Sequence, residues 1–179
     1  MKSSDPVALL LRILDEAYEK KAWHGPNLRG TLRGVGVRQA VWRPAPDRHN
    51  VWELAVHAAY WKYAGWRRLT GEKRGAFPVK GSNWFVRPKP SPRPPGRGRE
   101  TATEKAWRAD LALLDEQHRR LRSAVEKIPA RRLSALSPGS RHRIDTLVYG
   151  IAAHDVYHAG QIQLLKRLYR DRVGKRARG

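Results

Sequence analysis

The chain of 179 residues has no cysteine, a single methionine and only two phenylalanines. The absence of cysteine excludes disulfide bonds, iron–sulfur clusters, cysteine-ligated zinc and a cysteine nucleophile. Any metal ion bound by this protein must therefore be held by histidine, aspartate, glutamate or backbone oxygen.

Long hydrophobic runs are also missing. The longest apolar run near the start, residues 7–11, ends at Arg12. A membrane-spanning helix needs about 20 apolar residues, and a secretory signal needs a longer apolar core followed by a cleavage site. We therefore expect no membrane segment and a cytoplasmic location.

Acidic residues are scarce. The chain has 16 Asp and Glu against 37 Lys and Arg, which gives a net charge of +21. Such a charge attracts phosphate polymers, anionic lipid or acidic partners at low salt, but it identifies none of them. Nucleic-acid binding is therefore kept as an alternative and is not the favoured function. The length fits one domain, and seven Trp and six Tyr indicate a folded core.

Helical periodicity accounts for the first half of the chain. Asp5 can cap a helix whose first position is Pro6, and an apolar stripe continues from there to Tyr18. Asn50 followed by Glu53 resembles a capping box and predicts a second helix from about residue 51 to residue 70. The connection over residues 25–50 holds four Gly and three Pro, and we expect only a short helical turn around residues 32–42.

The second half contains two further helices. Thr101 with Glu104 predicts a capping box for a third helix that ends before Pro129, and Asp145 or Thr146 can cap a fourth. Six prolines between residues 78 and 95 predict a loop over 72–100. No segment alternates like a strand. The sequence therefore predicts an all-α four-helix bundle as one domain over 1–179, with an Arg/Pro-rich loop at 72–100 and a basic tail at 170–179.

Histidines interrupt the apolar stripes of two predicted helices. His154 and His158 are four residues apart and project from one face, and His57 replaces an apolar residue on the second helix. Three neutral imidazoles are enough for a metal site with open coordination positions, although hydrogen-bonded core histidines remain the alternative. Glu53, one turn before His57, can cap its helix or orient that ring. His118 can complete the site, line its floor or pack, and we favour the last two.

Three further residues are candidates for catalysis, and none can be assigned a role. Gln161 shares the face of His154 and His158, where it can contact substrate or a metal-bound water, or lie as a polar residue at the bundle edge. Asp155 stands where the H-E-x-x-H motif has its general base, but a solvent-side ion pair with an arginine is an equal alternative. Tyr60 can offer a hydroxyl to an oxyanion, although tyrosine at such positions is more often packed.

Two segments carry a family resemblance. W-E-L-A-V-H-A-A-Y-W-K at 52–62 and L-V-Y-G-I-A-A-H-D-V-Y-H-A-G-Q-I-Q-L-L-K at 147–166 resemble the DinB-like or YfiT-like family of metal-dependent hydrolases. L-R-G-V at 32–35 and A-W-x-x-D-L-x-L-L at 106–114 are also similar to it. The resemblance covers nearly the whole chain, except residues 87–99 and the tail after Arg170.

The resemblance implies a bundle of up-up-down-down order, often a homodimer. It also implies one divalent ion, typically nickel or zinc, held at the motif positions His57, His154 and His158. Relatives include enzymes that use the thiols mycothiol or bacillithiol. The leading hypothesis is therefore a hydrolase or thiol S-transferase that acts on a small-molecule substrate, with a low-molecular-weight thiol as a candidate cosubstrate.

One alternative is a metal-containing module without catalytic activity, whose basic segments 87–99 and 167–178 bind nucleic acid or an acidic partner. A bundle that keeps its ligands and has lost its activity is another.

Overall fold

The computed structural model describes residues 5–87 and 102–176, and within these ranges the regular elements are all helices. The all-α class predicted from the sequence is confirmed. Four helices are long and three elements are short. They are α1 (Pro6–Tyr18), α2 (Leu28–Thr31), α3 (Val37–Ala40), α4 (Val51–Thr70), α5 (Ala102–Glu126), a 3-10 turn (Ala130–Arg132) and α6 (Ile144–Arg176).

The predicted helix caps of α1 and α4 are present. The side chain of Asp5 accepts a hydrogen bond of 2.9 Å from the backbone N–H of Val7. Asn50 and Glu53 form the reciprocal capping box, and Gly71 ends α4 in the left-handed conformation that glycine favours, with φ 69°. The cap predicted at Thr101 lies outside the described residues.

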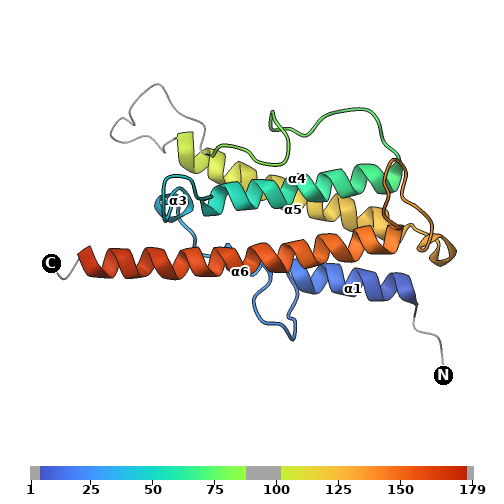
Figure 1. Ribbon diagram of the computed structural model, residues 1–179, viewed down its shortest axis with the longest axis horizontal. Coiled ribbons are helices and arrows are strands. Elements are labelled where there is room, and N and C mark those ends of the chain that lie inside the picture. The colour runs from blue at the N-terminus through green and yellow to red at the C-terminus, as the bar shows by residue number, and fades with distance from the viewer. Residues whose placement is uncertain (1–4, 88–101, 177–179) are drawn as a thin grey trace.

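The four long helices pack side by side: α4 contacts α5 and α6, and α1 contacts α5 and α6 (Figure 1). Helices α4 and α5 run in the same direction, because Trp52 bonds to Asp110 and Lys62, further along α4, lies beside His118, further along α5. Helices α1 and α6 run the opposite way (Figure 1). The order is therefore up-down-down-up, and the expected up-up-down-down order is wrong.

The connection after α4 explains this order. Tyr63 bonds to the carbonyl of Gly75, His57 to that of Asn83 and Asn50 to that of Arg87. Residues 72–87 thus run back along α4 toward its start, as the green trace above α4 shows (Figure 1). The next long helix can then begin beside the start of α4 and run parallel to it. The expectation of a loop holds for 72–87, and residues 88–100 lie outside the described part.

Helix α6 is longer than the sequence pattern predicted. It continues to Arg176, so residues 170–176 of the expected basic tail are helical, and residues 177–179 are not described. The stretch after Leu168 has no apolar stripe to reveal a helix, but it contains no proline, and arginine and lysine are good helix formers. The connection over residues 25–50 similarly holds two one-turn helices, α2 and α3, rather than one.

The hydrophobic core brings α4 and α6 close together. Gly65 on α4 faces Ile151 on α6, and a Cβ at Gly65 would lie 2.3 Å from the Ile151 Cδ1 atom. A side chain at position 65 would therefore require the Ile151 side chain to move. The core elsewhere is built from buried aliphatic and aromatic side chains of all four long helices. No helix in the described residues has the length and apolar character needed to cross a membrane.

Candidate metal centre

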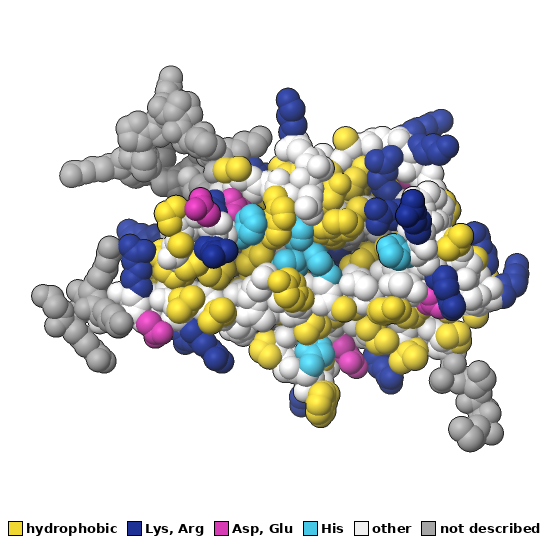
Figure 2. All heavy atoms as spheres, in the orientation of Figure 1, with side chains coloured by type: hydrophobic (Ala, Val, Ile, Leu, Met, Phe, Trp, Pro, Cys, Tyr) yellow, Lys and Arg dark blue, Asp and Glu magenta, His cyan; other side chains and the backbone are white. Residues whose placement is uncertain are grey.

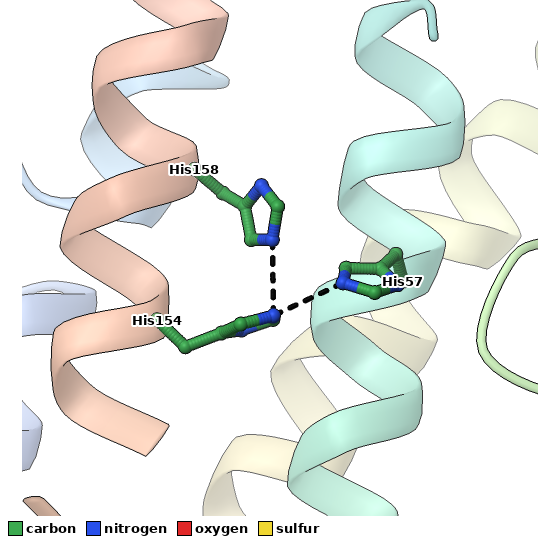
Figure 3. A group of neighbouring side chains, drawn as sticks. All are labelled: His57, His154 and His158. Carbon is green, nitrogen blue, oxygen red and sulfur yellow. Dashed lines mark hydrogen bonds between the residues drawn. The ribbon is translucent and has the colours of Figure 1, made fainter. Parts of the chain in front are cut away.

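Three histidine side chains meet between α4 and α6. His57 projects from α4 toward His154 and His158, which lie on adjacent turns of α6 (Figure 3). The Nε2 atom of His154 is 3.0 Å from the Nε2 atom of His57 and 3.0 Å from that of His158. The structure therefore brings together the three residues that the sequence singled out as metal ligands.

Hydrogen bonds on the far side of two rings determine which nitrogen faces the cluster. The Nδ1–H of His57 donates to the carbonyl oxygen of Asn83 at 2.7 Å. The Nδ1–H of His158 donates to Oε1 of Gln161 at 2.6 Å, and the Gln161 amide in turn donates to the Tyr157 hydroxyl. With the proton of a neutral imidazole on Nδ1, both Nε2 atoms keep a free lone pair.

This donor set fits a divalent ion. A single proton on His154 Nε2 can satisfy only one of its two close neighbours, so at least one nitrogen lone pair in the cluster is left without a donor. A cation between the rings would satisfy all three nitrogens. Tetrahedral zinc, with bonds of about 2.0–2.1 Å, separates its ligand nitrogens by about 3.4 Å, which is close to the two 3.0 Å spacings at His154. The opposite nitrogen of His154, Nδ1, is buried with no hydrogen-bond partner among the described residues.

The environment keeps the three imidazoles neutral. Burial lowers the pKa of His154 to about 3, and the positive charges of neighbouring groups act in the same direction. Burial also lowers the pKa of His158 to about 4, although its bond to Gln161 opposes the shift. The pKa of His57 is likewise lowered by burial. Neutral rings at pH 7 are the form that binds a metal.

A tryptophan from the loop after α4 covers one side of the cluster. The ring of Trp84 stacks on His57 with a centroid distance of 3.8 Å and on His49, on its other side, at 3.6 Å. Asn83 holds this turn in place, because its side chain accepts a 3.0 Å bond from the Trp61 indole N–H. The backbone of Asn83 has a positive φ of 61°, a conformation that asparagine tolerates better than most residues.

Sequence reasoning missed Asn83 and Trp84. Both lie in the proline-rich connection, where no periodicity indicates which face of the chain points inward. The one available signal was the run Gly81-Ser82-Asn83, whose residue types favour a turn. Such a run does not show which helix the turn will contact.

Glu53 does not orient His57. Burial tends to raise the pKa of its carboxyl group, but hydrogen bonds from Arg43, His49 and the Arg87 N–H outweigh burial and hold this pKa below its ordinary value. Because the Nδ1 atom of His57 is bonded to Asn83, the carboxylate serves as the helix cap and as the partner of Arg43.

The three candidate catalytic residues have different surroundings. Gln161 contacts His158 and positions its ring. Asp155 forms a fully buried ion pair with Lys62, in place of the alternative solvent-side pair with an arginine, and burial raises the pKa of its carboxyl group against the pull of Lys62. Tyr60 packs against Phe77 and Phe85, each with a ring-centroid distance of 5.5 Å.

His118 is packed away from the cluster. Its ring stacks on Tyr18 at a centroid distance of 3.9 Å, and its Nδ1 atom is 3.4 Å from the Lys62 ammonium. Burial, reinforced by neighbouring positive charges, lowers the pKa of His118 to about 2. Of the roles considered for this histidine, packing is the one observed.

A cavity of about 330 Å³ opens beside His154, between α4 and the first turns of α6. Trp61 and Ile151 form apolar walls, and Arg68 lies at the α4 end. A small molecule can therefore reach the histidine cluster from this side.

Comparison with known proteins gives one match. The sequence model of the DinB superfamily matches residues 22–162, which is well over half of the chain and includes all three clustered histidines. No curated protein and no solved structure matches this chain.

Proposed function

Because this chain belongs to the DinB superfamily and three imidazole nitrogens converge in its core, we propose that it is a metal-dependent enzyme, either a hydrolase or a thiol S-transferase. The convergence of the three Nε2 atoms within 4.8 Å of one another carries the proposal. His57, His154 and His158 would hold one divalent ion, zinc or nickel. When bound, such an ion lowers the pKa of water or of a low-molecular-weight thiol and polarises an electrophile.

The chain's own residues prepare the site for this role. The carbonyl of Asn83 and the amide of Gln161 keep protons on the outer nitrogens of two rings, so the inner nitrogens are free as ligands. Trp84 stacks on His57 and covers one side of the cluster. The cavity beside His154 would give a small-molecule substrate access to the cluster from another side. A cytoplasmic location remains a prediction.

Elemental analysis tests the metal site directly. Untagged protein, purified without a metal-affinity column, should contain close to one divalent ion per chain. The His154→Ala variant should lose this ion, because two remaining imidazoles leave the site short of a ligand. His118→Phe is the matched control, since it removes a buried histidine outside the cluster and should keep the ion.

Two results would contradict the proposed metal site or its test. If the folded protein contains no metal and takes up neither zinc nor nickel when these are added, the three histidines are core residues and the proposed enzyme is wrong. Equal loss of metal in the His118→Phe variant would show that the loss reflects a damaged fold and would remove the support that His154→Ala gives.

The basic-module alternative gains no support from the described residues. Most of the basic segment 87–99 lies outside them, and residues 167–176 form the end of α6.

A further inference from the structure

The cavity beside His154 has a different character at each end. His154 lies at one end, and Arg68, from the last turn of α4, lies at the other together with His142. The walls between them are mainly apolar, and none of the described residues that line the cavity is acidic. A molecule that fills this cavity would thus have its two ends in very different surroundings.

Helical geometry places Arg68 on the histidine side of α4. Trp61 and Arg68 follow His57 by 4 and 11 residues, and 11 residues at 100° each bring Arg68 back to within about 20° of the His57 direction. The distance along the helix axis from His57 to Arg68 is about 16 Å. The Trp61 ring lies between them, with its centroid 6.2 Å from that of His154 and 5.8 Å from the guanidinium carbon of Arg68.

The guanidinium of Arg68 is available for a ligand. Its only described side-chain interaction is the stacking on Trp61, and it forms no ion pair with any carboxylate in the part of the chain that the structure describes. The backbone carbonyl of Arg68 accepts a 3.1 Å bond from Ser137 Oγ, and this bond ties the connection before α6 to the end of α4. His142 of the same connection also lines the cavity.

A glycine keeps the cavity open on the α6 side. A Cβ atom built on Gly150 would meet no other atom within 4 Å, so a side chain there would project into free space. Gly150 is one helical turn before His154 and lines the cavity. A glycine inside a helix costs about 1 kcal/mol relative to alanine, and tight packing does not require one at this position.

We propose that this cavity binds a small carboxylate with an apolar body, held at Arg68 by its carboxylate group and directed by Trp61 so that its other end lies at the three histidines. This inference rests on the proposed function, because the histidine cluster is taken as the reacting end. Arginine binds carboxylates with two parallel hydrogen bonds, and the apolar walls suit an aliphatic or aromatic body. Figure 2 shows cyan histidine side chains near the centre of this face with hydrophobic side chains beside them, and Lys and Arg side chains toward both ends of the face.

Binding to metal-free protein tests the subsite separately from the metal. We would titrate chelator-treated protein with 4-phenylbutyrate and with its neutral amide at 0.15 M salt, using isothermal calorimetry. The carboxylate should bind at least about tenfold more tightly than the amide, because hydrogen bonds to a charged group contribute roughly 1.5–3 kcal/mol. Arg68→Gln should abolish this preference.

Matched variants distinguish binding at Arg68 from a general attraction of the carboxylate to a positively charged protein. Arg38→Gln removes the same charge from α3, at the other end of the molecule, and should leave the preference unchanged (Figure 1). Gly150→Leu should fill the cavity and prevent binding of both probes. Gly160→Leu alters another α6 glycine with free space around it, outside this cavity, and should bind both probes normally.

The proposal is overturned if 4-phenylbutyrate and its amide bind with equal affinity. It is also overturned if Arg68→Gln and Arg38→Gln weaken the binding of 4-phenylbutyrate to the same extent. Normal binding to Gly150→Leu would likewise exclude this cavity as the site. Because these measurements use metal-free protein, they test the carboxylate site independently of the metal site. A failure of one proposal can therefore be distinguished from a failure of the other.

Discussion

Single residues in this protein owe their roles to what lies against them. His118 and His158 are both buried histidines on helical faces, yet one stacks on Tyr18 and the other turns its Nε2 atom toward a neighbouring imidazole. The difference arises from the partner of Nδ1. In His158 this nitrogen donates to Gln161, whereas in His118 it lies beside the Lys62 ammonium and must act as an acceptor.

At this scale we predict that the protein loses stability at low pH and that His118 causes part of this loss. Burial lowers the pKa of His118 to about 2 in the folded protein, from the ordinary value of 6.5 for a histidine. The unfolded chain therefore binds a proton that the folded chain excludes, and stability falls as the pH drops below about 6.5. Each pH unit in that range costs about 1.4 kcal/mol, so the group accounts for about 2 kcal/mol between pH 6.5 and pH 5.

The His118→Phe variant tests this prediction. It keeps the aromatic stack on Tyr18 and removes the titrating group that faces Lys62, Arg119 and Arg122. Urea unfolding of metal-free protein should show a smaller loss of stability between pH 6.5 and pH 5 than in the wild type. If the stability of the two proteins changes identically with pH, His118 is not the source of the predicted loss. The three clustered histidines contribute equally in both proteins and cancel in this comparison.

At the scale of elements, an ion pair joins α4 to α6 in the core. Lys62 and Asp155 are both fully buried, and Oδ1 of Asp155 has no hydrogen-bond partner in the described residues. Removing one member of such a pair leaves an uncompensated buried charge, which costs about 3–5 kcal/mol. Replacing both members by apolar residues of similar size is often neutral or stabilising.

We therefore expect Asp155→Leu alone to be strongly destabilised and the double variant Lys62→Met/Asp155→Leu to recover most of the lost stability. Urea unfolding at pH 7 measures both. If the free energy of unfolding of Asp155→Leu lies within about 1 kcal/mol of the wild-type value, Lys62 is not held in the charged pair. This buried role also argues against Asp155 as a general base, because its carboxylate is occupied by Lys62.

At the scale of the whole molecule, α6 has apolar side chains that are exposed among the residues that the structure describes. Leu164 and Leu168 are 57% and 39% exposed, and Tyr157, seven residues before Leu164, is 63% exposed. Spacings of seven and four residues are those of a helix face that packs against another helix. The homodimer expected from the family resemblance stays a prediction, and this face is our proposal for its interface.

Light scattering tests the dimer. The mass should be twice the 20.5 kDa of one chain, and it should shift toward the monomer at low salt, because two chains of charge +21 repel each other. Leu164→Glu/Leu168→Glu should give monomer at moderate salt. Leu9→Glu, on an equally exposed position of α1, should not. A wild type that stays monomeric at high concentration would rule out this interface.

The sequence by itself determined the helical class, the caps at Asp5 and Asn50 and the set of three histidines. These features follow from local chemistry, because capping and helical periodicity depend on residues within a few positions of one another. The same reasoning left His118 ambiguous, since an isolated histidine on an apolar stripe has the same local pattern whether it packs or binds.

Only the tertiary structure decided the direction of the helices, the fixed tautomers and the cavity. The path of residues 72–87 along α4 depends on contacts with residues 12 to 37 positions away, such as those of Tyr63, His57 and Asn50. The pairing of Lys62 with Asp155 spans 93 positions. No local pattern encodes such distances, because they arise when packed helices bring remote side chains together, and that packing turns three histidines into one site.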